Sequence, residues 1–128
     1  MKILYNIPRI LISSHKGGAG KTIFTIGLIS AFKSLQIKLS TFKKGPDYID
    51  AGWLSKFSQT LCRNLDLFLF DEKDNLYSFY IGSQGSELAI IEGNRGLFDG
   101  LDVIGSCSTA KLAKVFKTPV ILVLDCTT

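Results

Sequence analysis

Short apolar runs alternate with longer amphipathic segments along the chain. The apolar runs are residues 10–12, 37–42, 88–91 and 120–124, and a helical pattern covers residues 23–35. The runs are rich in β-branched residues and are separated by helical patterns, which favours buried parallel strands over alternating antiparallel ones. The pattern predicts an α/β fold in which a parallel sheet is flanked by helices.

A glycine-rich loop, SHKGGAGKT at residues 14–22, lies between the first predicted strand and the first helix. Its glycines let backbone N–H groups turn inward toward phosphate oxygens, and the helix N-terminus adds partial positive charge. Lys21 would reach the β- and γ-phosphates, and the Thr22 hydroxyl would bind Mg²⁺. This strand–loop–helix context predicts a P-loop NTPase that binds ATP or a similar triphosphate.

The loop departs from the usual pattern G-x-x-x-x-G-K-S/T, because His15 stands at the position of the first glycine. With its second lysine, Lys16, it resembles the deviant phosphate loops of chromosome-partitioning ATPases, the nitrogenase iron protein and ATP-dependent amide-forming ligases. In some of these families the extra lysine reaches the nucleotide of a second copy; the alternative leaves Lys16 in solvent. His15 has no metal-binding partner and is interpreted as a loop residue. The predicted nucleotide-binding residues are Lys16, Gly17, Gly18, Ala19, Gly20, Lys21 and Thr22.

Three carboxylates follow the second and third predicted strands. Asp47 and Asp50 come after a Gly-Pro stop signal, in a loop at the same sheet edge as the phosphate loop. Taken alone, Asp47 is equally well explained as the N-cap of the next helix. Glu92 ends the third strand, where its charge must be matched. We expect all three carboxylates to converge near Thr22 and share one Mg²⁺, directly or through water, with Asp50 the member that could instead face substrate.

Composition narrows the class of protein. The chain has 128 residues, 46% of them hydrophobic, which is enough for one core. No run approaches the roughly 18 apolar residues of a membrane span. Polar residues near the start of the chain interrupt the apolar stretch that a signal peptide would need. Three cysteines without zinc spacing indicate a reduced, cytoplasmic protein. The net charge is +4, and the lysines are scattered along the chain without a basic tract. We therefore expect neither nucleic acid nor a membrane as partner.

The last predicted strand is followed by few residues. Doubly wound nucleotide domains usually continue with further helices and strands, and a later loop normally contacts the base. We therefore expect an incomplete domain, with residues 1–128 as the N-terminal part of a P-loop ATP-binding synthetase domain. Either the chain is a fragment or a partner supplies the rest.

Several segments, in a preserved order, resemble the N-terminal part of the cobyrinic acid a,c-diamide synthase family, whose relatives include the hydrogenobyrinate and nickel-sirohydrochlorin diamide synthases. Beyond the phosphate loop they are FKKGPDYID at 42–50, RNLD at 63–66, IEGNRGLFDG at 91–100, GSCSTAKLA at 105–113 and PVILVLD at 119–125. The resemblance implies an ATP-dependent, glutamine-using amidoligase of the dethiobiotin-synthetase-like group. Such enzymes activate tetrapyrrole side-chain carboxylates as acyl phosphates, which ammonia converts to amides in cobalamin biosynthesis.

The resemblance also implies roles for single residues. Tyr48, Ile49 and Asp99 would face the substrate carboxylate or the acyl phosphate. Arg63 and Asn64 lie in a matching segment, but no chemistry can be derived for them; either they lock the loop or they touch the substrate. The candidate catalytic residues are Lys21, Tyr48 and Asp99, and the candidate metal ligands are Thr22, Asp47, Asp50 and Glu92.

Two departures from the family bear on function. Lys16 stands where many diamide synthases carry a small polar residue, which leaves room for a different substrate. Family members also carry a glutaminase domain with a cysteine nucleophile and a histidine base, and the single histidine of this chain lies in the phosphate loop. The glutaminase domain is therefore absent from residues 1–128, and ammonia would come from a separate glutaminase domain or subunit.

Two other interpretations stay open. One is a partitioning-ATPase-like switch that forms a homodimer on ATP and acts through a protein partner. The segment from Asp47 to Asp50, which such a switch does not need, favours the ligase. The other is an inactive remnant of the enzyme.

Overall fold

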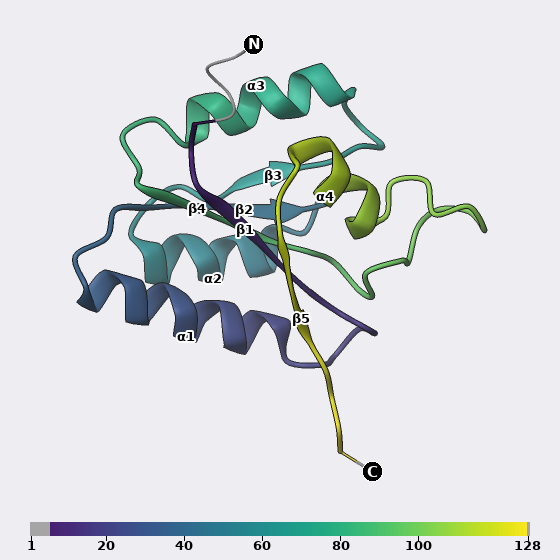
Figure 1. The fold of residues 1–128 in the computed structure, drawn as a ribbon, viewed down its shortest axis with the longest axis horizontal. Helices are drawn as coiled ribbons and strands as arrows, with labels where there is room; N and C mark the ends of the chain where they lie inside the picture. The colour runs from purple at the N-terminus through teal and green to yellow at the C-terminus, as the bar shows by residue number, and fades with distance from the viewer. Residues whose placement is uncertain (1–5, 128) are drawn as a thin grey trace.

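The computed structural model describes residues 6–127, which form a five-stranded parallel sheet with helices on both faces (Figure 1). In chain order the elements are β1 (Arg9–Ser14), α1 (Lys21–Ser34), β2 (Leu39–Lys44), α2 (Tyr48–Ser58), β3 (Arg63–Leu65), α3 (Glu72–Gly82), β4 (Leu88–Glu92), α4 (Thr109–Phe116) and β5 (Val120–Val123). The strands lie in the order β3-β2-β4-β1-β5, and every neighbouring pair is parallel. The predicted α/β class is confirmed.

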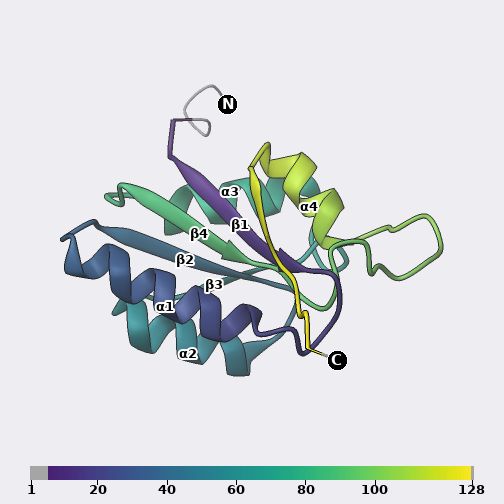
Figure 2. The same ribbon diagram turned by 60° about the horizontal axis from the view of Figure 1, so that its bottom comes forward.

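Side-chain alternation along the strands divides the core into two layers, because successive residues point to opposite faces of a sheet. Leu11 belongs to the cluster that packs against α3, where it joins Phe79. Its neighbour Ile12 belongs to the other cluster, with Ile29 of α1 and Leu54 of α2. Figure 2 shows α1 and α2 together on one face and α3 and α4 on the other. Burying each such side chain contributes about 1.5–3 kcal/mol, so both layers hold the helices in place.

The predicted strands are present as β1, β2, β4 and β5, whereas β3 was not predicted. Its sequence, Arg-Asn-Leu, is too short and too polar to give a strand pattern. The strand forms because its backbone pairs with β2. Within residues 6–127, none of the helices has the length and apolar character needed to cross a membrane.

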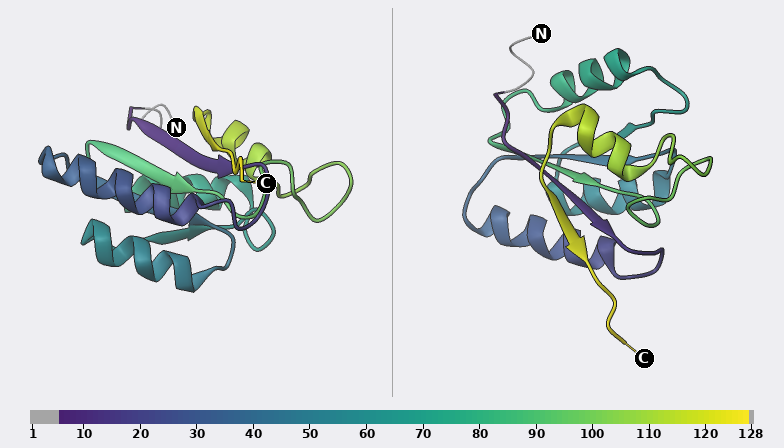
Figure 3. Two further views of the ribbon diagram at one scale, coloured as in Figure 1. Left: turned by 90° about the horizontal axis from the view of Figure 1, so that it is seen from below. Right: turned by 45° about the vertical axis from the view of Figure 1, so that its right-hand side comes forward.

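All five strands end at one edge of the sheet, on the right in Figure 2. The phosphate loop leaves this edge after β1, and the connection to α2 leaves it after β2. The long connection between β4 and α4 leaves it as well and projects from the body of the molecule (Figure 3). The loops that carry the predicted chemistry are therefore neighbours in space.

The cysteines provide a test of the core. Cys62 is 6% exposed and packs in the layer under α1 and α2, and burial raises the pKa of its thiol to about 11. Because the thiolate is the reactive form, iodoacetamide at about pH 8 should modify the exposed Cys126 and spare Cys62 until the chain is unfolded. Peptide mass spectrometry with and without guanidinium measures this. Equal labelling of both cysteines in the folded protein would contradict the packing.

Candidate functional site

Two charged side chains lie at the end of the core layer that α1 and α2 cover. Lys43 on β2 and Glu92 on β4 are register partners, and they are only 1% and 0% exposed. Lys43 Nζ lies 3.5 Å from Glu92 Oε1 and donates a hydrogen bond to the Gly93 carbonyl at 2.9 Å. The sheet register thus builds a buried ion pair at the carboxyl edge.

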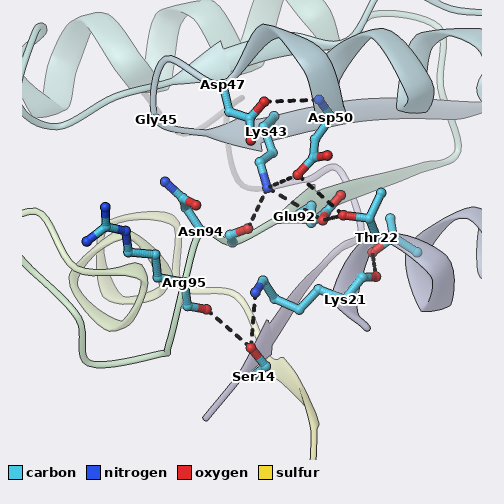
Figure 4. Close-up of polar contacts among 12 residues, drawn as sticks. Ser14, Lys21, Thr22, Lys43, Gly45, Asp47, Asp50, Glu92, Asn94 and Arg95 are labelled. Atoms are coloured by element: carbon cyan, nitrogen blue, oxygen red, sulfur yellow. Dashed lines mark hydrogen bonds and ion pairs between the residues drawn. The ribbon is translucent and has the colours of Figure 1, made fainter. Parts of the chain in front are cut away.

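The first turns of α1 and α2 add a hydroxyl and a second carboxylate (Figure 4). The Thr22 hydroxyl donates to Glu92 Oε1 at 2.6 Å and lies 3.3 Å from Asp50 Oδ2. Asp50 Oδ2 is 3.2 Å from Lys43 Nζ. The cluster of Thr22, Lys43, Asp50 and Glu92, called the Lys43 cluster below, therefore joins two strands and two helix N-termini.

The Lys43 cluster has the donor chemistry of a Mg²⁺ site. Burial raises the pKa of Glu92, while Lys43 and the Thr22 hydrogen bond oppose that shift and favour the carboxylate. Glu92 Oε2 is buried and accepts no hydrogen bond from any of the described residues. Carboxylate and hydroxyl oxygens are the ligands that Mg²⁺ takes beside phosphate oxygens. The residues present fit this ion.

Asp47 does not join the cluster. Its Oδ1 accepts the N–H groups of Ile49 and Asp50, both at 3.0 Å, and so caps α2. These N–H groups have no partner inside the helix, which is why the carboxylate is held there. In the described part of the chain, no group of three acidic, histidine or cysteine side chains could hold a metal ion. Asp50 and Glu92 therefore both lie beside Thr22, whereas Asp47 caps α2. The binding of a metal by these residues stays a prediction.

Lys21 begins α1 and extends back over the phosphate loop. Its Nζ donates to Ser14 Oγ at 3.1 Å, and its pKa is lowered by burial and by Lys43, against the opposing effect of Glu92. Gly20, just before it, has φ 92°, a conformation that side chains rarely adopt, so glycine allows the helix to start here. A cavity of about 410 Å³ opens at this point, lined by Gly17, Gly18, Gly20, Lys21, Thr22, Ile23, Lys43, Asp50, Asn94 and Arg95.

The connection after β4 packs tightly against the phosphate loop. The Leu97 N–H donates to the Ser14 carbonyl at 2.7 Å. A Cβ on Gly96 would come within 2.7 Å of the His15 carbonyl oxygen, so only glycine fits. Asp99 Oδ2 accepts the Gly96 N–H at 2.8 Å. The structure thus gives Asp99 a bracing contact within this loop, next to a second cavity that it lines.

The other residues singled out from the sequence lie outside the cluster. Tyr48 and Ile49 are 80% and 62% exposed on the first turn of α2. Asn64 Nδ2 donates to the carbonyls of Gly45 and Asp47 at 2.7 and 3.0 Å. Of the two roles considered for Asn64, the structure therefore shows the locking of the loop.

Lys16 lies at the rim of the loop. Its side chain is 54% exposed, and Nζ forms an ion pair with Asp125 Oδ2 at 2.9 Å. Hydrogen bonds from Thr127 and Lys16 hold the pKa of Asp125 well below its usual range. The cation of Lys16 is thus engaged within its own chain.

Sequence reasoning missed Lys43. The segment FKKGPDYID was recognised, but neither lysine received a role. Lys43 lies two residues after the buried Thr41, and strand alternation puts both on the same face. A lysine on the buried face of a strand needs a carboxylate partner. This requirement could have identified Lys43 from the sequence.

Comparison with curated proteins finds close sequence similarity. The chain is 48% identical over 122 residues to the cobyrinate a,c-diamide synthase of Magnetococcus marinus, covering 95% of this chain and 26% of that protein. The synthase of Clostridium acetobutylicum is 44% identical over 115 residues (90% of this chain, 26% of that protein), and that of Leptospira interrogans 42% over 120 residues (93% and 26%). The chain therefore spans about a quarter of the length of these curated relatives. No family model matches it.

From the contacts of the Lys43 cluster we expect that replacing Lys43 lowers the stability of the protein and that Mg²⁺ partly restores it. Lys43→Met removes the cation that contacts both Asp50 and Glu92, and we expect the free energy of unfolding in EDTA to fall by about 3–5 kcal/mol. Mg²⁺ should stabilise this variant more than the wild type, because it replaces the lost charge. Urea denaturation followed by circular dichroism measures both effects.

The double variant Lys43→Met/Glu92→Gln serves as the control. It removes the opposite charge as well, so it should regain stability without Mg²⁺. If Lys43→Met unfolds like the wild type in EDTA, the buried ion pair does not have the energetic role assigned to it.

Proposed function

This chain is homologous to the N-terminal quarter of cobyrinate a,c-diamide synthases, and we propose that it forms the ATP-binding part of an amidoligase acting on a cobyrinic acid-type tetrapyrrole. The acceptors would be the a- and c-side-chain carboxylates. Each would be activated as an acyl phosphate and converted to an amide by ammonia that a separate glutaminase domain or subunit releases from glutamine.

The observation that carries this proposal is the position of the Lys43 cluster beside Lys21 and the phosphate loop. Thr22, Lys21 and Asp50 line one cavity together with three loop glycines. Such a cavity supplies backbone donors and a cation to a triphosphate, and oxygen ligands to its metal. Thr22, Asp50 and Glu92 would hold the Mg²⁺, which would neutralise charge on the β- and γ-phosphates.

The proposed reaction has two steps. A carboxylate oxygen of the acceptor attacks the γ-phosphorus, the bond from that phosphorus to the β–γ bridging oxygen breaks, and ADP leaves. Ammonia then attacks the acyl carbon, and the carbon–oxygen bond to phosphate breaks. The first step brings two anions together, so a cation at the transferred phosphate lowers the barrier. Lys21 would supply that charge, and its amine donates a hydrogen bond to Ser14 Oγ at 3.1 Å.

The alternative of an ATP-driven switch would use Lys16 across a dimer. Lys16 instead pairs with Asp125 of its own chain. No contact of the described residues favours the switch over the ligase.

Lys21→Ala tests the proposed function. With ATP, Mg²⁺, cobyrinate and hydroxylamine as the trapping nucleophile, the wild type should release ADP and form a hydroxamate that depends on cobyrinate. Lys21→Ala should lose both by roughly 10²–10³-fold, because it lacks the cation at the transferred phosphate. Coupled ADP assay and mass spectrometry of the tetrapyrrole give the two readouts.

Lys33→Ala, which removes the same charge near the other end of α1, is the matched control and should keep wild-type rates. Circular dichroism confirms that both variants are folded. Undiminished turnover in folded Lys21→Ala would contradict the phosphate-loop assignment, and ADP release that ignores cobyrinate would contradict the acceptor.

A further inference from the structure

A second cavity, of about 400 Å³, adjoins the one at the phosphate loop. The two cavities share Asn94 and Arg95 as lining residues. The second cavity is otherwise built by the end of β2, the turn after β3 and the connection after β4, through Lys44, Gly45, Pro46, Asp66, Phe68, Leu69, Asp99, Gly100, Leu101 and Cys107. A ligand in it would therefore lie next to the triphosphate.

Two cations, Lys44 and Arg95, line this second cavity. Lys44 follows Lys43 on β2, so alternation directs it to the opposite face of the sheet. Within residues 6–127, no carboxylate lies within ion-pair distance of Lys44 or Arg95. Burial lowers the pKa of Lys44, the charge of Asp66 opposes that shift, and the charges of Lys43 and Arg95 add to it more weakly. Two like charges that share a cavity favour an anion between them.

The two carboxylates of the cavity already brace their own loops. Asp66, 8% exposed, accepts the Phe68 N–H at 2.8 Å. Asp99 accepts the Gly96 N–H at 2.8 Å. Both acids thus shape the walls, and neither neutralises a cation by direct contact.

Arg95 is fixed by its backbone while its guanidinium is free to bind. Its φ of 53° lies in the left-handed region, which is uncommon for a residue other than glycine. Its carbonyl accepts a hydrogen bond at 3.2 Å from Ser14 Oγ, the same atom that Lys21 contacts. Figure 4 shows the guanidinium directed away from Lys21. The residue therefore links the phosphate loop to the second cavity.

We propose that the second cavity binds a carboxylate substituent of the acceptor other than the one being activated, with Lys44 and Arg95 as its anion-binding residues. This rests on the proposed function. The planar guanidinium matches a carboxylate through two parallel hydrogen bonds. Phe68 and Leu69, 70% and 58% exposed, offer apolar contact to the body of a polycarboxylic acid. Holding one carboxylate here would orient another toward the γ-phosphate in the neighbouring cavity.

Calorimetric titration of cobyrinate into the chain tests the inference, in the presence of Mg²⁺ and the non-hydrolysable analogue AMP-PNP. Lys44→Gln and Arg95→Gln should each weaken cobyrinate binding by roughly tenfold or more, since each removes a charged hydrogen-bond donor. The double variant should lose on the order of 100-fold. Lys44→Gln, whose residue lines the second cavity and not the phosphate-loop cavity, should keep the AMP-PNP affinity of the wild type. Lys73→Gln, an exposed lysine of α3, removes the same charge elsewhere and should bind as the wild type does.

A neutral ligand distinguishes the contribution of the carboxylate charge to binding from that of the rest of the ligand. The fully methyl-esterified form of cobyrinate has no carboxylate, so it should bind the wild type and the double variant with equal affinity. Thermal denaturation shows whether each variant is folded as the wild type is.

Three outcomes would overturn the inference. If the double variant keeps wild-type affinity for cobyrinate, the cavity is not a carboxylate site, and the proposed function stands. If AMP-PNP binding falls as much as cobyrinate binding, the two cations belong to the nucleotide site. If the wild type binds AMP-PNP but not cobyrinate, both the inference and the proposed function fail.

Discussion

The buried ion pair between Lys43 and Glu92 is the interaction on which the rest of the site depends. Each side chain comes from a central strand, and removing either one would leave an unmatched charge in the core. A shift of either strand by one residue would turn its side chain to the opposite face. The pair therefore requires one register of β2 with β4, and that register brings the start of α2 to Glu92. The pairing of β1 with β4 brings the start of α1 to the same edge.

The charges of this edge are balanced before a ligand arrives. Lys21 and Lys43 are matched by Asp50 and Glu92, and each of these carboxylates also lies near the Thr22 hydroxyl. A triphosphate adds several negative charges to this arrangement. Backbone N–H groups of the phosphate loop, the helix N-terminus and a divalent cation can each compensate for part of them. This balance explains why an oxygen-rich cluster lies directly against a loop that is otherwise cationic.

Much of this organisation could be predicted from the sequence, because it is encoded locally. Glycine spacing gave the phosphate loop, and short apolar runs gave four of the five strands. Glu92 was found because a carboxylate at the end of a buried strand needs a partner. The short strand β3 depends on pairing with β2, which leaves no local pattern. Asp47 was predicted as a metal ligand because a carboxylate in this position can serve equally as a helix cap or as a ligand. Only the structure shows that it accepts hydrogen bonds from the N–H groups of Ile49 and Asp50.

We infer that Thr22 and its carboxylate partners hold the metal of a bound triphosphate. Mn²⁺ replaces Mg²⁺ at oxygen-ligated sites and can be counted by electron paramagnetic resonance. With AMP-PNP present, the wild-type chain should bind one Mn²⁺, Thr22→Ser should do the same, and Thr22→Val should bind it roughly tenfold or more weakly, because the hydroxyl ligand is lost. Equal Mn²⁺ affinity for Thr22→Val and the wild type would contradict this account.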